Sequence, residues 1–272
     1  MKTQIIDKLL SQPWHMHPSR ARTIIGTMIQ RLRGERPDED VFGNPLPTMT
    51  IVGDVAVIPV VGTLMVNVPD WFKEYGLNVT DANDIGEEIT SALNNPAVSL
   101  IVLNIDSPGG WSAAGDKLFD LVEAANKIKP VLGWCADGAD CCSSAYECAA
   151  PSQAILTGPY SLAVGCIGSY LAVLDVTEYW KMMGVSWEVF RSDEFKGMGI
   201  DGFSEQQRAF LQSTVDQAGA TFRKNVSKYR TLIDPEDMQG QYFTGSEAAK
   251  RGFSAGTSPD LSTAIAKFRR MI

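Results

Sequence analysis

The sequence contains almost no histidine and no recognisable metal-binding spacing. Its two histidines, His15 and His17, lie in a proline-flanked stretch near the N-terminus, where we expect them to be surface or capping residues. None of the cysteines forms a CxxC pair or has a histidine nearby that could complete a zinc site. Histidine is therefore a poor candidate for a catalytic base, and we expect neither a metal nor an organic cofactor.

Long hydrophobic runs and basic clusters are also missing. No segment approaches the ~18 consecutive apolar residues that a membrane span needs, and residues 1–33 contain no apolar core of the kind found in secretion signals. The formal net charge is −8, and Lys and Arg do not gather among aromatic residues, as they do on many nucleic-acid-binding surfaces. We expect a cytoplasmic protein with no membrane anchor and no nucleic-acid partner.

The cysteine content does not fit a disulfide framework. There are five cysteines, an odd number, and two of them, Cys141 and Cys142, are neighbours. We expect small buried thiols in a reducing compartment, with a nucleophilic Cys142 as the alternative interpretation. The remaining composition, 44% apolar and 21% charged, is typical of a globular protein with one sizeable domain.

Strand-like and helix-like patterns alternate along residues 51–272. Apolar runs predict strands at 55–61, 99–105, 131–135, 154–157 and 185–190, and amphipathic patterns predict helices at 81–93, 113–127, 144–150, 176–183 and 205–229. Alternating strands and helices indicate βαβ units and an α/β fold. Before this domain, residues 19–33 have a helical apolar face and residues 34–49 are charged and proline-rich, so we expect an N-terminal helical arm and linker over residues 1–50.

The segment Asp106–Gly110, with the sequence DSPGG, follows a run that reads as a buried parallel strand. Two glycines without Cβ allow backbone N–H groups to approach a ligand closely. Such amides can stabilise an oxyanion, although the two glycines alone could equally form an ordinary turn. We assign no chemistry to Asp106.

Ser143 lies among small residues in the sequence CCSSAY, at the start of a predicted helix. The amide of the next residue is free at such a position, so Ser143 is a candidate nucleophile; taken alone, it could also be an N-cap serine. A serine hydroxyl needs a base to accept its proton. With histidine disfavoured, the remaining common base is a lysine whose pKa is lowered by burial.

Five motifs in order connect these segments to a known family. They are DSPGG at 106–110, CSSAYE at 142–147, VGCIGS at 164–169, RSDEFKGMG at 191–199 and YFTGSEAAKRGF at 242–253. In order and spacing they resemble the signal peptide peptidase A family over about residues 51–255. Each motif alone is weak, but five in sequence make coincidence a poor explanation.

The resemblance implies a Clp protease/crotonase-like fold and a serine peptidase with a Ser/Lys dyad. Ser143 falls at the nucleophile, Lys196 at the general base, and the amides of Gly110 and Ser144 at the oxyanion hole. Cys166 stands where the family has a serine that hydrogen-bonds the lysine, so it is a possible lysine-orienting residue with a weaker donor. The family further implies assembly into homo-oligomeric rings, in which serine and lysine can come from neighbouring subunits.

The short members of this family that lack a membrane anchor are often phage or prophage proteins, and they share a Pro-Trp segment such as Pro13-Trp14 ahead of the protease domain. Those proteins are capsid-assembly, or head maturation, proteases. The resemblance therefore implies scaffold and coat proteins as substrates and a location in the host cytoplasm or the procapsid interior. The alternatives are a cytoplasmic protein-degrading enzyme, a catalytically impaired capsid scaffold, and a crotonase-type acyl-CoA enzyme.

Overall fold

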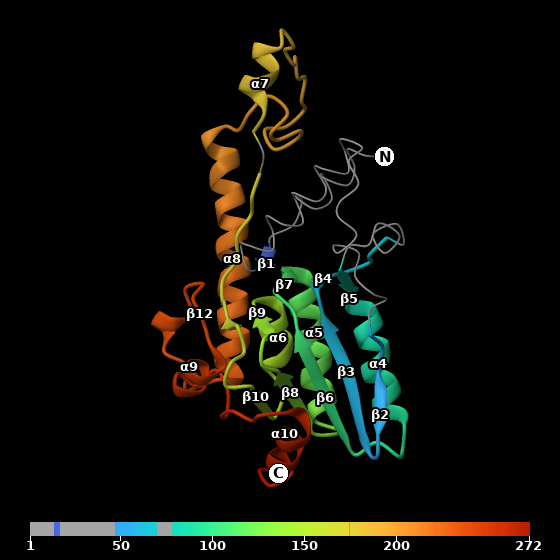
Figure 1. The fold of residues 1–272 in the computed structure, drawn as a ribbon. Coiled ribbons are helices and arrows are strands. Elements are labelled where there is room, and N and C mark those ends of the chain that lie inside the picture. Colours follow the sequence, from blue (N-terminus) through green and yellow to red (C-terminus); the bar gives the residue numbers. More distant parts are fainter. Residues whose placement is uncertain (1–13, 17–46, 70–77, 174) are drawn as a thin grey trace.

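The computed structural model describes residues 14–16, 47–69, 78–173 and 175–272. They form an α/β body from which a long arm projects (Figure 1). The predicted helical arm at 19–33 lies outside the described residues, as does most of the predicted linker at 34–49. The domain boundary expected near residue 50 therefore stays a prediction.

A five-stranded sheet lies at the centre of the body, in the order β10-β8-β6-β3-β2. Its strands are β2 (Thr50–Val52), β3 (Val55–Val61), β6 (Leu100–Asp106), β8 (Val131–Cys135) and β10 (Ala154–Thr157). All neighbours pair in parallel except β2, which pairs with β3 in the antiparallel sense at the edge. The parallel pairing of β6 on both sides confirms the buried strand predicted ahead of the DSPGG motif.

The central sheet is covered on both faces, which explains its almost continuous apolar strands. Side chains of β6 alternate between two cores: Ile101 and Leu103 pack with the helices α4 and α5, whereas Leu100 and Val102 pack against α10. These helices are α4 (Ala82–Asn94), α5 (Ser112–Asn126) and α10 (Leu261–Phe268). The period of two along the strand therefore separates the two layers of helices.

Two smaller sheets lie beyond the carboxyl ends of the central strands. One has the order β1-β7-β4-β5 and the other the order β12-β11-β9. The first contains β1 (Trp14–Met16), β4 (Thr63–Met65), β5 (Val79–Asp81) and β7 (Gly109–Trp111); the second contains β9 (Asp140–Cys142), β11 (Ala163–Gly165) and β12 (Tyr242–Phe243). The predicted motifs at 106–110, 142–147 and 164–169 meet in these sheets.

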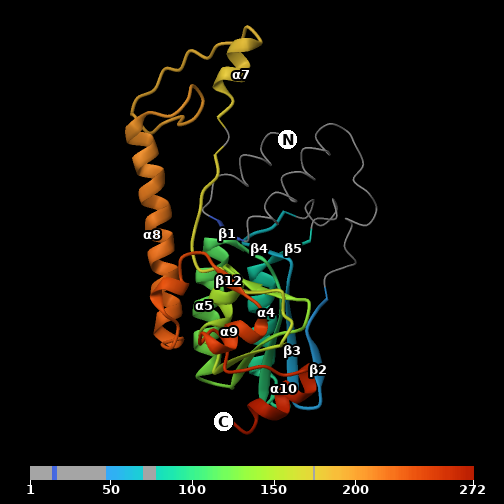
Figure 2. The same ribbon diagram turned by 60° about the vertical axis from the view of Figure 1, so that its left-hand side comes forward.

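The chain leaves the body after β11, forms an arm with the short helix α7 (Thr177–Met182), and returns through the long helix α8 (Glu205–Tyr229). In both ribbon views α8 stands beside the body and the arm extends beyond it (Figures 1 and 2). The strand predicted at 185–190 is wrong, because these residues are irregular. They are mostly exposed and have no neighbouring strand, and an alternating pattern without a pairing partner does not form a strand.

The short helix α6 (Ser144–Ala149) and the helix α9 (Gly245–Lys250) complete the body. Every helix predicted within the described residues is present within two residues of its expected ends. The α/β fold class is thereby confirmed.

Candidate active site

Ser143 lies at an abrupt junction between a strand and a helix. Strand β9 ends at Cys142 and helix α6 begins at Ser144, so Ser143 alone makes the turn, with φ 59° and ψ −125°. A positive φ is costly for a residue with a Cβ and is found mostly where the surroundings enforce it. The Ser143 amide donates to the carbonyl of Gly165 (2.7 Å), which holds the turn in place. This arrangement is that of a nucleophile elbow.

The hydroxyl of Ser143 is available for chemistry. The residue is 1% exposed, and its Oγ has no hydrogen-bond partner among the residues that the structure describes. The Ser144 Oγ is likewise buried without a partner among these residues, but its side chain faces α5: a Cβ added at Gly115 would lie 2.9 Å from the Ser144 Cβ. The amide of Ser144, as the first of α6, has no carbonyl one turn earlier to donate to. The geometry thus fits a hydroxyl role for Ser143 and an amide role for Ser144.

Gly110 lies in strand β7 between two other backbones. It is paired with Leu64 of β4 on one side and with His15 of β1 on the other. A Cβ at this position would lie 1.8 Å from the carbonyl oxygen of Leu64, so only glycine fits. The preceding Gly109 has φ 96°, a conformation that glycine adopts without strain.

Hydrogen bonds join the glycine loop to the Ser143 turn. The amide of Ser107 donates to Asp140 O (2.7 Å), and the amide of Cys142 donates to Ser107 O (3.1 Å). The carboxylate of Asp106 accepts from the amide of Asp140 (3.1 Å) and so orients the loop. Hydrogen bonds therefore join the two motifs, whose residues Gly110 and Ser143 are 33 positions apart in the sequence.

Cys166 lies on the opposite side of the Ser143 turn. It follows Gly165, has φ 57°, and packs with Cys142 and Ala163. Only three non-glycine residues in the described part of the chain have a positive φ, and Ser143 and Cys166 are two of them. Such strained positions concentrate at functional sites, which supports the assignment of this region as the candidate site.

The cysteines next to Ser143 do not have the environment of a nucleophile. Burial raises the pKa of the Cys166 thiol to about 11. The pKa of Cys142 is also raised, mainly by burial and further by Cys166. The reactive form of cysteine is the thiolate, so this environment argues against the alternative of a nucleophilic Cys142.

Tyr170 is a polar residue of this region that the sequence pattern did not reveal. Its hydroxyl is buried and has no hydrogen-bond partner within the described residues. The pKa of Tyr170 is raised to about 12, chiefly by burial and further by the nearby Cys166. A tyrosine two residues after the GCIG turn looks like any core aromatic, so no sequence signal distinguishes it.

Within the described residues, Lys196 and Ser143 lie in different parts of the structure. Lys196 is in the arm, between α7 and α8, with an exposed side chain and its amide bonded to Asp193 O (3.0 Å). The arm points away from the body that contains α6 (Figure 1). The described residues therefore do not supply the burial expected for a lysine base. Cys166, in the body, is likewise separated from Lys196.

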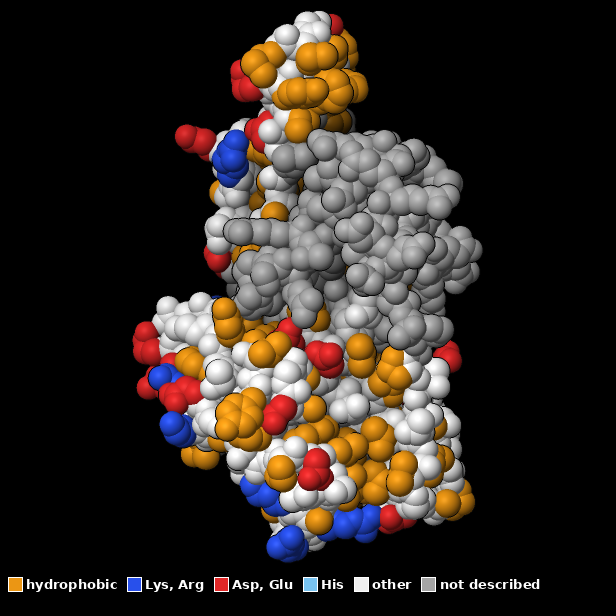
Figure 3. Space-filling view, in the orientation of Figure 1, with side chains coloured by type: hydrophobic (Ala, Val, Ile, Leu, Met, Phe, Trp, Pro, Cys, Tyr) orange, Lys and Arg blue, Asp and Glu red, His pale blue; other side chains and the backbone are white. Residues whose placement is uncertain are grey.

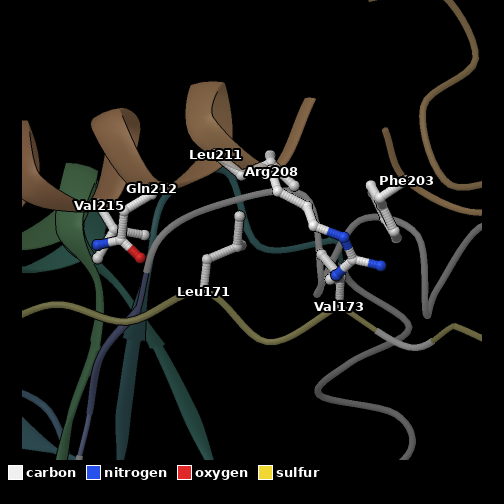
Figure 4. Close-up of a pocket in the computed structure, with 7 residues that line it drawn as sticks. All are labelled: Leu171, Val173, Phe203, Arg208, Leu211, Gln212 and Val215. Carbon is white, nitrogen blue, oxygen red and sulfur yellow. The ribbon is translucent and has the colours of Figure 1, made fainter. Parts of the chain in front are cut away.

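The arm and the start of α8 form an apolar surface of their own. A pocket of about 210 Å³ lies between α8 and the irregular segment that leads from β11 into the arm (Figure 4). It is lined by Leu171, Val173, Phe203, Arg208, Leu211, Gln212 and Val215. Hydrophobic side chains also gather at the tip of the arm (Figure 3). They include Met182, Trp187 and Phe190, which are 80%, 58% and 87% exposed. Exposed apolar surface of this extent usually marks an interaction site.

Among the described helices, none combines the length and apolar character that crossing a membrane requires. Within the same residues, no three His, Cys, Asp or Glu side chains come together as metal ligands would.

The described residues thus form an α/β protein with a serine at a strand–helix junction, hydrogen-bonded to a loop whose glycine is held at backbone contact distance. The sequence matches peptidase family S49 over residues 123–267, just over half of the chain. The chain belongs to this family, and the family recognition made from the five motifs is confirmed.

Relatives with known names include phage proteins. The head-tail preconnector protein GP5 of Enterobacteria phage P21 is 27% identical, covering 84% of this chain and 45% of that protein. The capsid assembly protease C of Escherichia phage lambda is 27% identical, covering 75% and 46%. The chloroplastic serine protease SPPA of Arabidopsis thaliana is 26% identical, covering 68% and 28%. The chain thus spans about half the length of the phage relatives.

Solved structures resemble the chain more loosely. A 1510-N membrane-bound stomatin-specific protease is 14% identical with a TM-score of 0.43, covering 80% of this chain and 86% of that one. A member of the enoyl-CoA hydratase/isomerase family is 12% identical with a TM-score of 0.44, covering 82% and 75%.

Proposed function

We propose that the protein is a serine endopeptidase in which Ser143 is the nucleophile and Lys196 the general base. The observation that carries the proposal is the strained turn at Ser143, whose hydroxyl has no partner among the described residues and whose turn is hydrogen-bonded to the glycine loop. Membership of peptidase family S49 supports the same reaction.

The proposed reaction is acyl transfer through a covalent intermediate. The neutral amine of Lys196 accepts the proton of Ser143 Oγ as this oxygen attacks the peptide carbonyl carbon. The amides of Gly110 and Ser144 stabilise the negative charge that develops on the carbonyl oxygen. The protonated amine then gives its proton to the leaving nitrogen, and water hydrolyses the ester on Ser143 with the amine again as base.

The length of α8 supports a dyad assembled from two subunits. Gln207, near the start of α8, bonds to the Lys196 segment, and Asn225, near its end, bonds to Glu147 of α6, one turn after Ser143. At about 1.5 Å per residue, the two anchors are about 27 Å apart along the helix. The Lys196 segment is thus anchored near the start of α8, whereas α6 is anchored near its end. In the proposed assembly, Lys196 of one subunit therefore serves Ser143 of its neighbour.

The exposed apolar tip of the arm supports this homo-oligomer, since contact between subunits would remove it from water. Burial of Lys196 in the same contact would favour its neutral form. The expected contact between subunits would thus both bury Lys196 and bring it to Ser143 of the neighbouring subunit.

The proposed substrates are capsid scaffold and coat proteins of a phage or prophage, cleaved in the host cytoplasm or inside the procapsid. This proposal rests on the similarity to the phage P21 and phage lambda proteins named above. A general protein-degrading peptidase is the second candidate, and similarity to the Arabidopsis protease favours it.

Hydrolysis of casein by two adjacent variants tests the nucleophile. Ser143→Ala should abolish turnover, because it removes the attacking oxygen. Ser144→Ala should reduce turnover less, because the proposed role of Ser144 uses only its amide. An active Ser143→Ala variant with an inactive Ser144→Ala variant would reverse the two assignments.

A further inference from the structure

The start of α8 is closed by a reciprocal pair of hydrogen bonds. The hydroxyl of Ser204 accepts from the amide of Gln207, and Oε1 of Gln207 accepts from the amide of Ser204, each at 3.2 Å. This capping box satisfies two amides that would otherwise lack partners. Gln207 is 2% exposed although it lies at the base of a projecting arm.

The same two side chains also hold the segment that carries Lys196. Nε2 of Gln207 donates to the carbonyl of Glu194 (2.6 Å), and the Ser204 hydroxyl donates to the Glu194 carboxylate (2.6 Å). The ring of Phe195 packs on Phe210 of α8, with 5.2 Å between the ring centroids. Both residues immediately before Lys196 are therefore fixed to the first two turns of α8.

Glutamine is well suited to position 207, because it offers an acceptor and a donor on one planar group. Its oxygen closes the capping box while its nitrogen reaches the Glu194 carbonyl. Glutamate could keep the first bond, but its carboxylate would face a carbonyl oxygen and could not make the second. Aliphatic side chains could make neither bond.

We propose that Gln207 is a positioning residue for Lys196. It links the backbone carbonyl two residues before the lysine to the first turn of α8, and so fixes the direction in which the Lys196 amine points. The inference rests on the proposed function, because it assumes that Lys196 is the base. It adds that the orientation of the Lys196 amine is set by the capping box of α8 rather than by the arm itself.

Gln207→Glu tests this role with little change of volume, and Gln206→Glu is its matched control. Gln206 is the exposed neighbour in the same helical turn, so the control introduces the same charge without touching Glu194. We expect Gln207→Glu to lower kcat on a peptide substrate about tenfold, because small displacements of a reacting group reduce rates by such factors. KM should stay within about twofold of the starting protein, since substrate contacts are unchanged. Gln206→Glu should keep the full kcat.

Two outcomes contradict the inference: a Gln207→Glu variant with unchanged kcat and pH–rate profile, or equal losses in both variants. The variant Lys196→Ala, measured in the same assay, distinguishes a failure of the positioning role from a failure of the proposed function. If Lys196→Ala stays active, the proposed base is wrong. If it is inactive while Gln207→Glu is fully active, only the positioning role fails.

Unfolding and size-exclusion profiles show whether Gln207→Glu folds and assembles normally. If it does not, Ser204→Ala provides the decision: it removes the hydroxyl that contacts the Glu194 carboxylate and the Gln207 backbone amide, and keeps the side-chain amide of Gln207 that bonds to the Glu194 carbonyl. A several-fold lower kcat in this variant supports positioning through Glu194. An unchanged kcat contradicts it and leaves Gln207 with a purely structural role.

Discussion

At the scale of single residues, the candidate site depends on backbone conformations that the sequence only partly reveals. The small residues around Gly110 and Ser143 indicate close approach and a helix start. The positive φ of Ser143 does not follow from its sequence, because serine rarely adopts it; the turn is imposed by the pairing of β9 with β11 and the bond to Gly165. The close approach at Gly110 and the helix start after Ser143 were predictable, but the strained backbone of Ser143 was not.

Gly110 is the residue whose replacement should be least tolerated. A methyl group there would overlap the Leu64 carbonyl oxygen, at 1.8 Å, whereas one at Gly168 would meet nothing closer than 3.7 Å. Gly110→Ala should therefore lower the free energy of unfolding by more than about 2 kcal/mol, the range of severe packing defects. Urea unfolding of both variants checks this. Equal stability of Gly110→Ala and Gly168→Ala would contradict the observed strand packing.

The buried cysteines should be unreactive in the folded protein. Burial raises the pKa of Cys135 and Cys148 to about 12 and that of Cys166 to about 11, so these thiols stay protonated at pH 8. Alkylation by iodoacetamide requires the thiolate. We expect slow labelling of the folded protein at pH 8 and rapid labelling of all five cysteines in denaturant, measured by mass spectrometry. Rapid labelling of Cys142 in the folded state would revive it as a nucleophile.

At the scale of helices and strands, long periodic segments were predictable and short paired ones were not. Helix α8 was predicted with its observed ends from the helical pattern of residues 205–229, and the structure shows that it begins at a Ser-x-x-Gln capping box. The three-residue strands β7, β9 and β11 carry too little pattern to be read from sequence, yet they bring the motifs together. The strand predicted at 185–190 failed for the opposite reason: the pattern was present and the partner was not.

Helix α8 should also stabilise helix α6, which begins directly after Ser143. Nδ2 of Asn225 donates to the fully buried Glu147 of α6 (2.9 Å). Asn225→Leu removes this bond and leaves a buried carboxylate with one donor fewer, which costs about 1–3 kcal/mol. We expect a corresponding decrease in the free energy of unfolding by urea, together with a lower kcat. Unchanged stability would mean that α8 does not support α6.

At the scale of the whole molecule, the fold class and family followed from the sequence, whereas the distance between the two proposed catalytic residues did not. The order of the sequence motifs places Ser143 and Lys196 in one active site only by analogy with the peptidase family. The structure instead anchors the Lys196 segment to the start of α8 and helix α6 to Asn225 near its end, with Lys196 on an exposed arm (Figure 1). The sequence pattern alone does not tell whether a motif completes the active site of its own subunit or that of a neighbouring subunit.

A mixture of two inactive variants tests the shared site. Ser143→Ala and Lys196→Ala should each be inactive, but subunits exchanged between them should regain part of the activity, because some contacts then pair an intact Ser143 with an intact Lys196. Peptide hydrolysis after co-refolding measures this recovery. A mixed assembly, verified by two affinity tags, that remains inactive would contradict a dyad formed between subunits.

The covalent intermediate on Ser143 is the most direct test of the account. The protein is mixed with an activated peptide ester, quenched in acid within seconds and digested, and the acylated residue is located by mass spectrometry. The account predicts an acyl group on Ser143 that is absent from Ser143→Ala and still forms in Ser144→Ala. An acyl group on Ser144 or Cys142, or none during active turnover, would contradict it.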